Sequence, residues 1–242
     1  MSRRPLDRRR FLQGLTAAGM AAFTTRGVFA QQLVETGTTT EGPFYPDKLP
    51  LDTDNDLLII NDAITPAVGE ITHLTGRVLT KTGQPVRNAF VEIWQVDHTG
   101  SYVHTGGRQP TGFDKNFQGY GRFLSDSKGQ YYFRTIKPID YTLIGIFRTA
   151  HIHFAVSQNG RRVFTSQLMV NGHPANARDG IIKNLDARAL KTLLVDFKPI
   201  AGSKLGELAA NFDIVLGATV NELETGPLRG VAPSARQRRS GG

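Results

Sequence analysis

The sequence predicts an all-β fold: an antiparallel β-sandwich with long loops and one or two short helices. Two observations lead to this prediction. Short runs rich in β-branched and aromatic residues recur along most of the chain, and turn residues such as Gly, Asn, Asp and Pro separate them. No regular helical pattern lies between these runs, which excludes alternating strands and helices and favours two packed antiparallel sheets.

The expected strands begin after residue 70. They span residues 71–80, 90–96, 129–136, 151–157, 163–170 and 212–216. Helices are expected within residues 179–194, where isoleucine and leucine recur at helical spacing. Residues 36–50 are rich in Thr, Gly and Pro and are expected to form an ordered arm or loop. Phe44 and Tyr45 lie between prolines in this arm, so we expect them to pack against another part of the protein.

The basic residues concentrate at the two ends of the chain. The formal net charge is +8, yet residues 1–30 hold six arginines and one aspartate, and residues 226–242 hold four arginines and no acid. The charge left for residues 31–225 is about −1, which argues against a nucleic-acid-binding face. We expect one sandwich domain over residues 31–225 and a disordered basic tail over residues 226–242.

Residues 1–30 have the features of a twin-arginine export signal. Arg8-Arg9-Arg10-Phe11-Leu12 precedes small and apolar residues, and Val28-Phe29-Ala30 forms a small-x-small cleavage pattern before Gln31. The apolar run is too short for a membrane span because Arg26 interrupts it. We therefore expect export by the twin-arginine route to the periplasm or beyond, with a basic disordered arm as the alternative. That route carries folded proteins, which is consistent with a bound cofactor.

The absence of cysteine excludes disulfides and thiolate metal sites. A metal ion would have to be bound by His, carboxylate or phenolate groups. His151 and His153 lie two residues apart at the start of an expected strand, so both imidazoles point to the same face and can bind one ion. Alone, this pattern is equally compatible with a surface pair of histidines.

Tyr102 and Tyr141 are two tyrosines that a sandwich would bring near this strand. Because the pKa of phenol is near 10, tyrosine is a useful ligand only for a strongly Lewis-acidic, hard cation. Ferric iron is the physiological candidate. Taken singly, each tyrosine is more simply interpreted as an aromatic residue that covers an edge of the sandwich.

Four blocks of the sequence resemble the intradiol ring-cleavage dioxygenases, the family of protocatechuate 3,4-dioxygenase and catechol 1,2-dioxygenase. The blocks are residues 40–45, residues 74–78 with 91–95 and 100–102, residues 131–141, and residues 148–154. Their order and spacing are far more specific than any single motif. The resemblance implies a non-haem Fe(III) enzyme that uses O2 to cleave a catechol-type, protocatechuate-like ring. Cleavage would fall between the two hydroxylated carbons and give a cis,cis-muconate-type product.

The resemblance also implies roles for individual residues. Tyr102 and His153 match the equatorial iron ligands of the family, and Tyr141 and His151 match the axial pair. Tyr141 would leave the metal when substrate binds and would take up a substrate proton.

Three further residues match positions around the substrate. Arg148 matches the arginine beside the bound ring, where its charge can stabilise developing carbanion character. Gln167 matches a glutamine near that arginine, and Tyr45 matches an aromatic residue that borders the substrate pocket. His104 lies close to Tyr102 in sequence, but the family motif does not require it.

The chain departs from the family between Tyr141 and Arg148. A proline usually follows the axial tyrosine, and a longer loop leads to the arginine. Here residues 142–147 form a shorter, more apolar connection. This departure implies a differently shaped, more open pocket and leaves the catechol derivative unassigned.

Two alternatives remain open at the level of sequence. The first is an exported β-sandwich that binds a ligand without catalysis. The second is a copper or zinc site on the two histidines, in which the tyrosines would be superfluous. Iron content and colour separate these from the dioxygenase, whose partners would be a small catechol-type substrate and O2. A homo-oligomer is compatible with the sequence.

Overall fold

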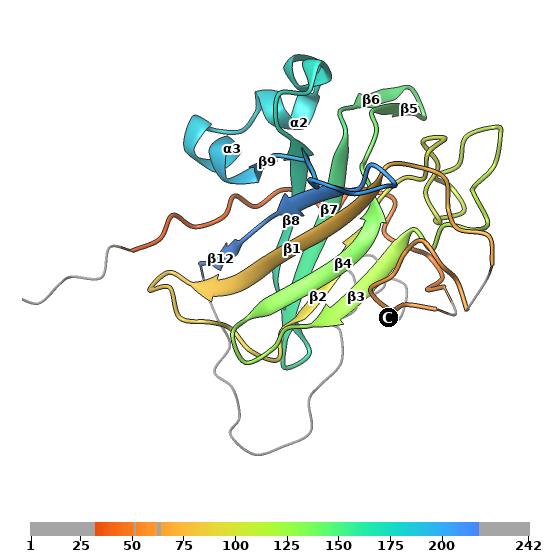
Figure 1. Cartoon of the computed structure of the whole chain (residues 1–242). Coiled ribbons are helices and arrows are strands. Elements are labelled where there is room, and N and C mark those ends of the chain that lie inside the picture. The colour runs from red at the N-terminus through yellow and green to blue at the C-terminus, as the bar shows by residue number, and fades with distance from the viewer. Residues whose placement is uncertain (1–31, 51, 62–63, 218–242) are drawn as a thin grey trace, which may run out of the picture. The chain divides into compact units, whose positions relative to one another are not determined.

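The computed structural model describes residues 32–50, 52–61 and 64–217. Its strands form two five-stranded sheets and one short hairpin (Figure 1). The first sheet consists of β1 (Ile71–Thr80) with its partners β4 (Gln130–Ile136), β11 (Leu208–Asn211) and β12 (Ile214–Leu216), and of β10 (Lys198–Pro199) beside β11. The second sheet has the order β3 (Tyr120–Leu124), β2 (Phe90–Trp94), β7 (His151–Gln158), β8 (Arg161–Val170) and β9 (Leu194–Val195). The hairpin consists of β5 (Tyr141–Leu143) and β6 (Ile146–Arg148).

The main hydrophobic core lies between the two sheets. Leu74 of β1 and Phe133 of β4 enter it from one side, and Ile93, Ile152 and Phe154 enter it from the other. Each of these side chains is fully buried. Burial of an aliphatic or aromatic side chain of this size contributes about 1.5–3 kcal/mol, so this cluster provides most of the driving force for packing the sheets.

Strand β7 separates the main core from the candidate site. Successive side chains of a strand point to opposite faces. Ile152 and Phe154 therefore face the main core, whereas His151 and His153 face a second cluster made largely of aromatic residues. All eight residues of β7 are buried, so both faces of the strand are covered.

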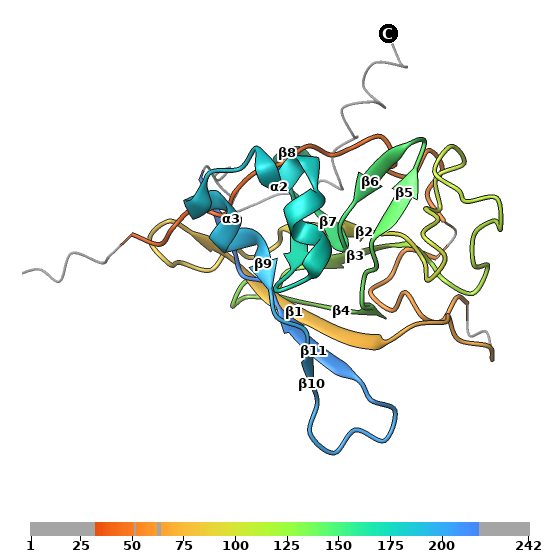
Figure 2. The same cartoon turned by 90° about the horizontal axis from the view of Figure 1, so that it is seen from above.

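A short helical segment follows β8. It comprises the 3-10 helix η1 (Pro174–Arg178), α2 (Gly180–Lys183) and α3 (Ala187–Leu193) (Figure 2). Asp179 caps α2, because its side chain accepts hydrogen bonds from the backbone N–H groups of Ile181 and Ile182. Ile182 and Leu193 join the main core and attach the segment to the sandwich.

The all-β sandwich and its two short helices confirm the fold expected from the sequence. Three strand pairs, β1–β11, β1–β12 and β8–β9, are parallel and depart from a purely antiparallel arrangement. Parallel pairing needs a long crossover, and the helical segment between β8 and β9 provides one. β2 ends at Trp94, two residues earlier than expected, and β12 begins at Ile214, after Phe212. Strands β3, β5, β6, β9, β10 and β11 were not expected.

The sequence also led to expectations about the two ends of the chain and about a membrane span. The expected export signal (residues 1–30) and the expected tail (residues 226–242) lie outside the described residues. Within the described part of the chain, no helix has the length and apolar character needed to cross a membrane.

Candidate metal centre and adjoining cavity

Four side chains that the sequence singles out converge on one point. The Tyr102 Oη lies 2.9 Å from the Tyr141 Oη, 3.0 Å from the His153 Nε2 and 3.3 Å from the His151 Nε2. The two Nε2 atoms are 3.2 Å apart. All four side chains are buried.

The backbone around Tyr102 brings it to Tyr141. Asp97, after β2, accepts hydrogen bonds from the backbone N–H groups of Thr99 and Ser101 and so holds the turn before Tyr102. Gly100 in this turn has a φ of +85°, and a Cβ there would meet the Tyr141 Cβ at 3.0 Å. Glycine at position 100 therefore permits the turn and the close approach of the two tyrosines.

The two histidines are held as neutral imidazoles. The His151 Nδ1 donates a 2.5 Å hydrogen bond to the Thr149 carbonyl, which leaves the lone pair of Nε2 facing the other donors. Burial, aided by the nearby Arg148 charge, lowers the pKa of His151 to about 3. Burial also lowers the pKa of His153 well below its usual value, with further contributions from His151 and Arg148.

The two tyrosines are neutral phenols in this environment. Burial raises the pKa of Tyr102 well above 10, and the neighbouring Tyr141 raises it further. Burial also raises the pKa of Tyr141, although the hydrogen bond with Tyr102 and the charge of Arg148 partly oppose this. Ionisation of either phenol at neutral pH therefore requires a strong positive charge placed against its oxygen.

The four donor atoms fit a bound metal ion. Ligand distances of about 2.0–2.1 Å and angles of about 90–110° place neighbouring donor atoms about 2.8–3.4 Å apart, which matches the observed separations. Among the described residues, no group of three or more His, Cys, Asp or Glu side chains could bind a metal. The two phenols are therefore what completes this donor set.

A cavity of about 640 Å³ adjoins the four donors. Tyr141 and His153 line it, whereas Tyr102 and His151 are not among its lining residues. The arm at residues 40–44 forms one wall, and the β5–β6 hairpin with the start of α2 forms the other. Gly42 in this arm has a φ of +73°, and a Cβ there would lie 3.2 Å from the His153 Cε1. The arm therefore passes directly over the ring of His153.

Arg148 lines the cavity and is held from two sides. Its Nε donates to the Asp179 Oδ2 at 2.9 Å, and its Nη2 donates to the Gln167 Oε1 at 2.5 Å. Asp179 also accepts from the backbone N–H of Thr149 and is fully buried. Burial opposes ionisation of Asp179, but Arg148 and these N–H groups outweigh it and keep the Asp179 pKa below its usual value. Asp179 was not among the residues expected at the site, because the only local signature of Asp179 in the sequence is that of a helix cap.

Tyr45 and Gln167 are not lining residues of the cavity. The Tyr45 hydroxyl donates a 2.6 Å hydrogen bond to the Glu92 Oε1, and its ring packs edge-on against Trp94. Trp94 in turn stacks on His153, with 4.8 Å between the ring centroids. Tyr45 therefore supports the site from behind, through Trp94, although the sequence suggested a residue at the pocket border.

A buried charge network surrounds Tyr45. Arg162 donates to the Glu92 Oε2 and to the Glu41 Oε2, each at 2.7 Å. Tyr120 also donates to Glu92, whose pKa is nevertheless raised by its burial. Glu41 belongs to the arm over the cavity, so Arg162 fastens that arm to the second sheet.

His104, which the sequence analysis set aside, lies apart from the four donors. Its Nδ1 accepts from the backbone N–H of Gly106, and its ring packs on Phe44.

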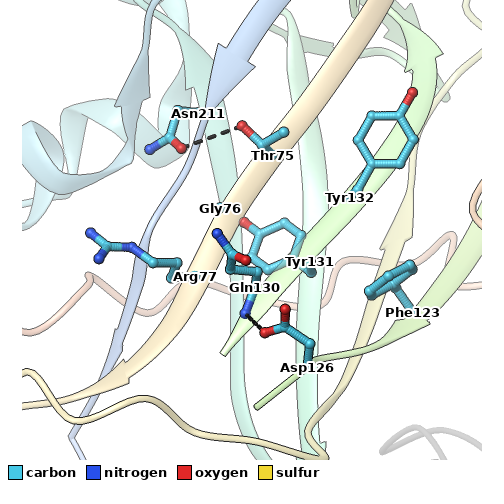
Figure 3. Close-up of a pocket in the computed structure, with 9 residues that line it drawn as sticks. All are labelled: Thr75, Gly76, Arg77, Phe123, Asp126, Gln130, Tyr131, Tyr132 and Asn211. Carbon is cyan, nitrogen blue, oxygen red and sulfur yellow. Dashed lines mark hydrogen bonds between the residues drawn. The ribbon is translucent and has the colours of Figure 1, made fainter. Parts of the chain in front are cut away.

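A second hollow, of about 450 Å³, is lined by Thr75 and Tyr132 of the first sheet and by Phe123 of β3 (Figure 3). Several of its polar groups already have protein partners. Thr75 contacts Asn211, and Asp126 accepts from the backbone N–H of Gln130. Arg77 forms an ion pair with Asp213. This hollow therefore lacks the convergent donor atoms of the first cavity.

Comparison with known proteins places this chain in one class. The family model described as "Dioxygenase" matches residues 40–218. The chain is 38% identical over 154 residues to the protocatechuate 3,4-dioxygenase beta chain of Burkholderia cepacia, covering 62% of this chain and 65% of the relative. It is 33% identical over 157 residues to catechol 1,2-dioxygenase 2 of Acinetobacter lwoffii, covering 58% of this chain and 54% of the relative. The chain thus spans less than two thirds of the length of either relative.

A solved structure gives the same result. The dioxygenase domain of a dioxygenase carbohydrate-binding protein fusion from Streptomyces sp. SirexAA-E aligns with a TM-score of 0.57 and 25% identity, covering 76% of this chain and 99% of that chain. The chain belongs to the intradiol ring-cleavage dioxygenase family, as its sequence motifs indicate.

Proposed function

We propose that this protein is a non-haem Fe(III) intradiol dioxygenase, which uses O2 to open a catechol-type ring between its two hydroxylated carbons and gives a cis,cis-muconate-type diacid. Tyr102, Tyr141, His151 and His153 are the proposed iron ligands. One observation carries the proposal: two phenol oxygens and two imidazole nitrogens meet within 2.9–3.3 Å, beside a cavity large enough for substrate.

The donor set favours ferric iron over copper or zinc. Two neutral imidazoles would suit any of these metals. The pKa values of both phenols are raised by burial, so only a strongly Lewis-acidic cation would convert them to phenolates. Two phenolates would then offset most of the trivalent charge. When bound, ferric iron would supply the Lewis acid that binds both substrate oxygens and polarises the ring towards dioxygen.

Tyr141 is the proposed proton acceptor. Of the two tyrosines, only Tyr141 lines the cavity, so its Oη is the phenol oxygen that an entering catechol meets. The Tyr141 Oη would take a proton from a substrate hydroxyl, and Tyr102 would remain as the buried ligand. His151 would keep its orientation through the Thr149 carbonyl.

Arg148 is the proposed stabiliser of negative charge on the ring. Its guanidinium lines the cavity and is fixed by Asp179 and Gln167, so the charge is already oriented before substrate arrives. Gln167 would act through Arg148. Tyr45 would act through Trp94 and His153 rather than by touching the substrate.

The test is product analysis with iron-loaded protein. Catechol should consume one equivalent of O2 and yield cis,cis-muconate, and Tyr102→Phe should lose both iron and activity. Tyr132→Phe is the matched control, because the Tyr132 hydroxyl contacts His73 on the first sheet, outside the site. Cleavage beside the hydroxyls, which would give an aldehyde acid, or full activity in Tyr102→Phe would refute the proposal.

We also propose that the protein is exported by the twin-arginine route and acts in the periplasm or outside the cell. The arginine triplet and the Val28-Phe29-Ala30 pattern support this. The mature protein should begin at Gln31, and Arg8→Lys with Arg9→Lys and Arg10→Lys should retain it in the cytoplasm. An active, exported protein that still carries residues 1–30 would contradict the proposal.

A further inference from the structure

The cavity is larger than a catechol ring requires. An apolar cavity of about 150 Å³ is sufficient to bind benzene. The cavity beside the four donors has a volume of about 640 Å³, which is within the usual range for small-molecule sites. Room therefore remains beyond the ring for a substituent.

The wall that a substituent would meet is apolar. The β5–β6 hairpin contributes Leu143, Ile144, Ile146 and Phe147, and Ile181 and Phe44 lie on the same cavity. Ile144 and Ile146 remain 67% and 56% exposed, so this wall presents uncovered apolar surface. Burying such surface against a ligand is favourable in proportion to its area.

The charged residues of the cavity are already paired. Among the described lining residues, Arg148 is the one permanent cation, and Asp179 and Gln167 hold it at 2.9 Å and 2.5 Å. Glu41 is paired with Arg162 at 2.7 Å. A substrate carboxylate would have to compete with buried Asp179 for Arg148, which is costly, or lie against the apolar hairpin, where it gains no ion pair from a lining residue.

The backbone of Ile144 is a second, independent observation. Its φ is +46°, a left-handed conformation that β-branched residues rarely adopt and that Asn or Gly usually occupies at the tip of a hairpin. The side chain is also largely exposed. Both the left-handed backbone and the exposure to solvent disfavour isoleucine at position 144. We interpret its presence there as a sign that the side chain contacts a ligand.

We propose that the preferred substrates are catechols with an uncharged, apolar ring substituent, and that carboxylated catechols are poor substrates. This inference rests on the proposed function and narrows the protocatechuate-like substrate that the sequence suggested. The substituent would lie along the β5–β6 hairpin, and the two hydroxyls would face Tyr141 and His153.

A matched pair of substrates tests the proposal. The substituents of 4-isopropylcatechol and protocatechuate each have three non-hydrogen atoms and one branch point, but only the second is charged. We expect the kcat/KM of iron-loaded protein to be at least about 10-fold higher for 4-isopropylcatechol, a factor typical of apolar discrimination in a pocket. Equal or better use of protocatechuate, with unsubstituted catechol also cleaved, would overturn the inference and leave the proposed function standing. Failure of iron-loaded protein to cleave any of the three catechols would overturn both.

A charge introduced into the wall provides a second test. Ile146→Lys places a cation beside the substituent, and the residue is exposed enough to tolerate the change. The preference for 4-isopropylcatechol over protocatechuate should fall by about 10-fold. Ile200→Lys is the matched control, because Ile200 is exposed and directly follows β10. Strand β10 lies well away from β5 and β6 (Figure 2), so the ratio should not change. An unchanged ratio in Ile146→Lys would contradict the proposed wall.

Discussion

Both faces of β7 are buried, but one packs in the main core and the other carries two of the four donors. Ile152 and Phe154 face a core of aliphatic and aromatic side chains whose only requirement is close packing. His151 and His153, one residue away, face two phenols, and Nδ1 of His153 is a buried polar atom without a hydrogen-bond partner in the described structure. Burial alone therefore does not identify a core. A face of a strand that brings polar atoms together has to be explained by a ligand or by function.

Substitution on the polar face should have the largest effect. His153→Leu removes the Nε2 donor with little change in volume, so iron and colour should be lost and kcat/KM for catechol should fall at least ~10³-fold, or about 4 kcal/mol. The free energy of unfolding of the metal-free protein should change by less than about 2 kcal/mol. Iron analysis, kinetics and urea unfolding measure these three quantities.

Ile152→Ala is the matched change on the opposite face. It should cost about 2–5 kcal/mol of unfolding free energy by leaving a cavity, while the iron content stays intact. If both variants lost stability equally and both retained iron, the proposed division between the faces would be wrong.

A substitution in the buried charge network of Arg162, Glu92 and Glu41 should also lower stability strongly. Arg162→Met leaves the fully buried Glu92 without its cation, so the free energy of unfolding should fall by about 3–5 kcal/mol. Arg77→Met breaks the Arg77–Asp213 pair, which is partly exposed, and should cost less than about 1 kcal/mol. Urea denaturation of both variants distinguishes the two. Similar losses would show that burial does not set the strength of these pairs.

Asp179→Asn should have an intermediate effect. Asparagine still caps α2 but removes the charge opposite Arg148, so kcat/KM for catechol should fall by about 10–100-fold. Arg148 would then be free to pair with a carboxylate, and the preference against protocatechuate should weaken. A purely structural role for Asp179 would lower both substrates equally.

The same variant should change stability in acid. The pKa of Asp179 is lowered in the folded protein, so its charge stabilises the fold above the unfolded pKa of about 3.9 and this contribution is lost as pH falls through the lower folded value. Asp179→Asn should therefore lose less stability than the parent protein below about pH 4. Urea midpoints measured from pH 3 to 6 provide the comparison, and identical acid slopes would contradict it.

The smallest expected effect is at the tip of the hairpin. Ile144→Asn suits the left-handed backbone and should raise the free energy of unfolding by about 1 kcal/mol, while reducing the preference for 4-isopropylcatechol. Ile146→Asn on the same hairpin should give no such gain in stability. Thermal unfolding of both variants tests this. A loss of stability in Ile144→Asn would show that the turn is not strained.

The long strands could be predicted from the sequence because alternation is a local feature. His-x-His spacing pointed only to His151 and His153, and Tyr102 and Tyr141 were joined to them through the family resemblance, because their distance from the histidines along the chain leaves no local pattern. The β5–β6 hairpin was missed because Ile144-Gly145 replaces the usual Asn-Gly of such a turn, so the connection resembled an apolar loop. Asp179 was missed because it pairs with an arginine 31 residues away, which no local pattern reveals. Tyr45 was expected at the pocket border. In the structure, the Tyr45 hydroxyl instead donates a hydrogen bond to Glu92, a buried carboxylate that needs hydrogen-bond donors.

The most direct test of the account is a visible absorption spectrum of the iron-loaded protein, recorded before and after catechol is added without oxygen. We expect a reddish tyrosinate-to-iron(III) charge-transfer band that shifts when catechol binds, since Tyr102 and Tyr141 are proposed ligands and Tyr141 lines the cavity. A colourless protein that does not respond to catechol after confirmed ferric loading would contradict the account and favour a sandwich that binds ligands without catalysis.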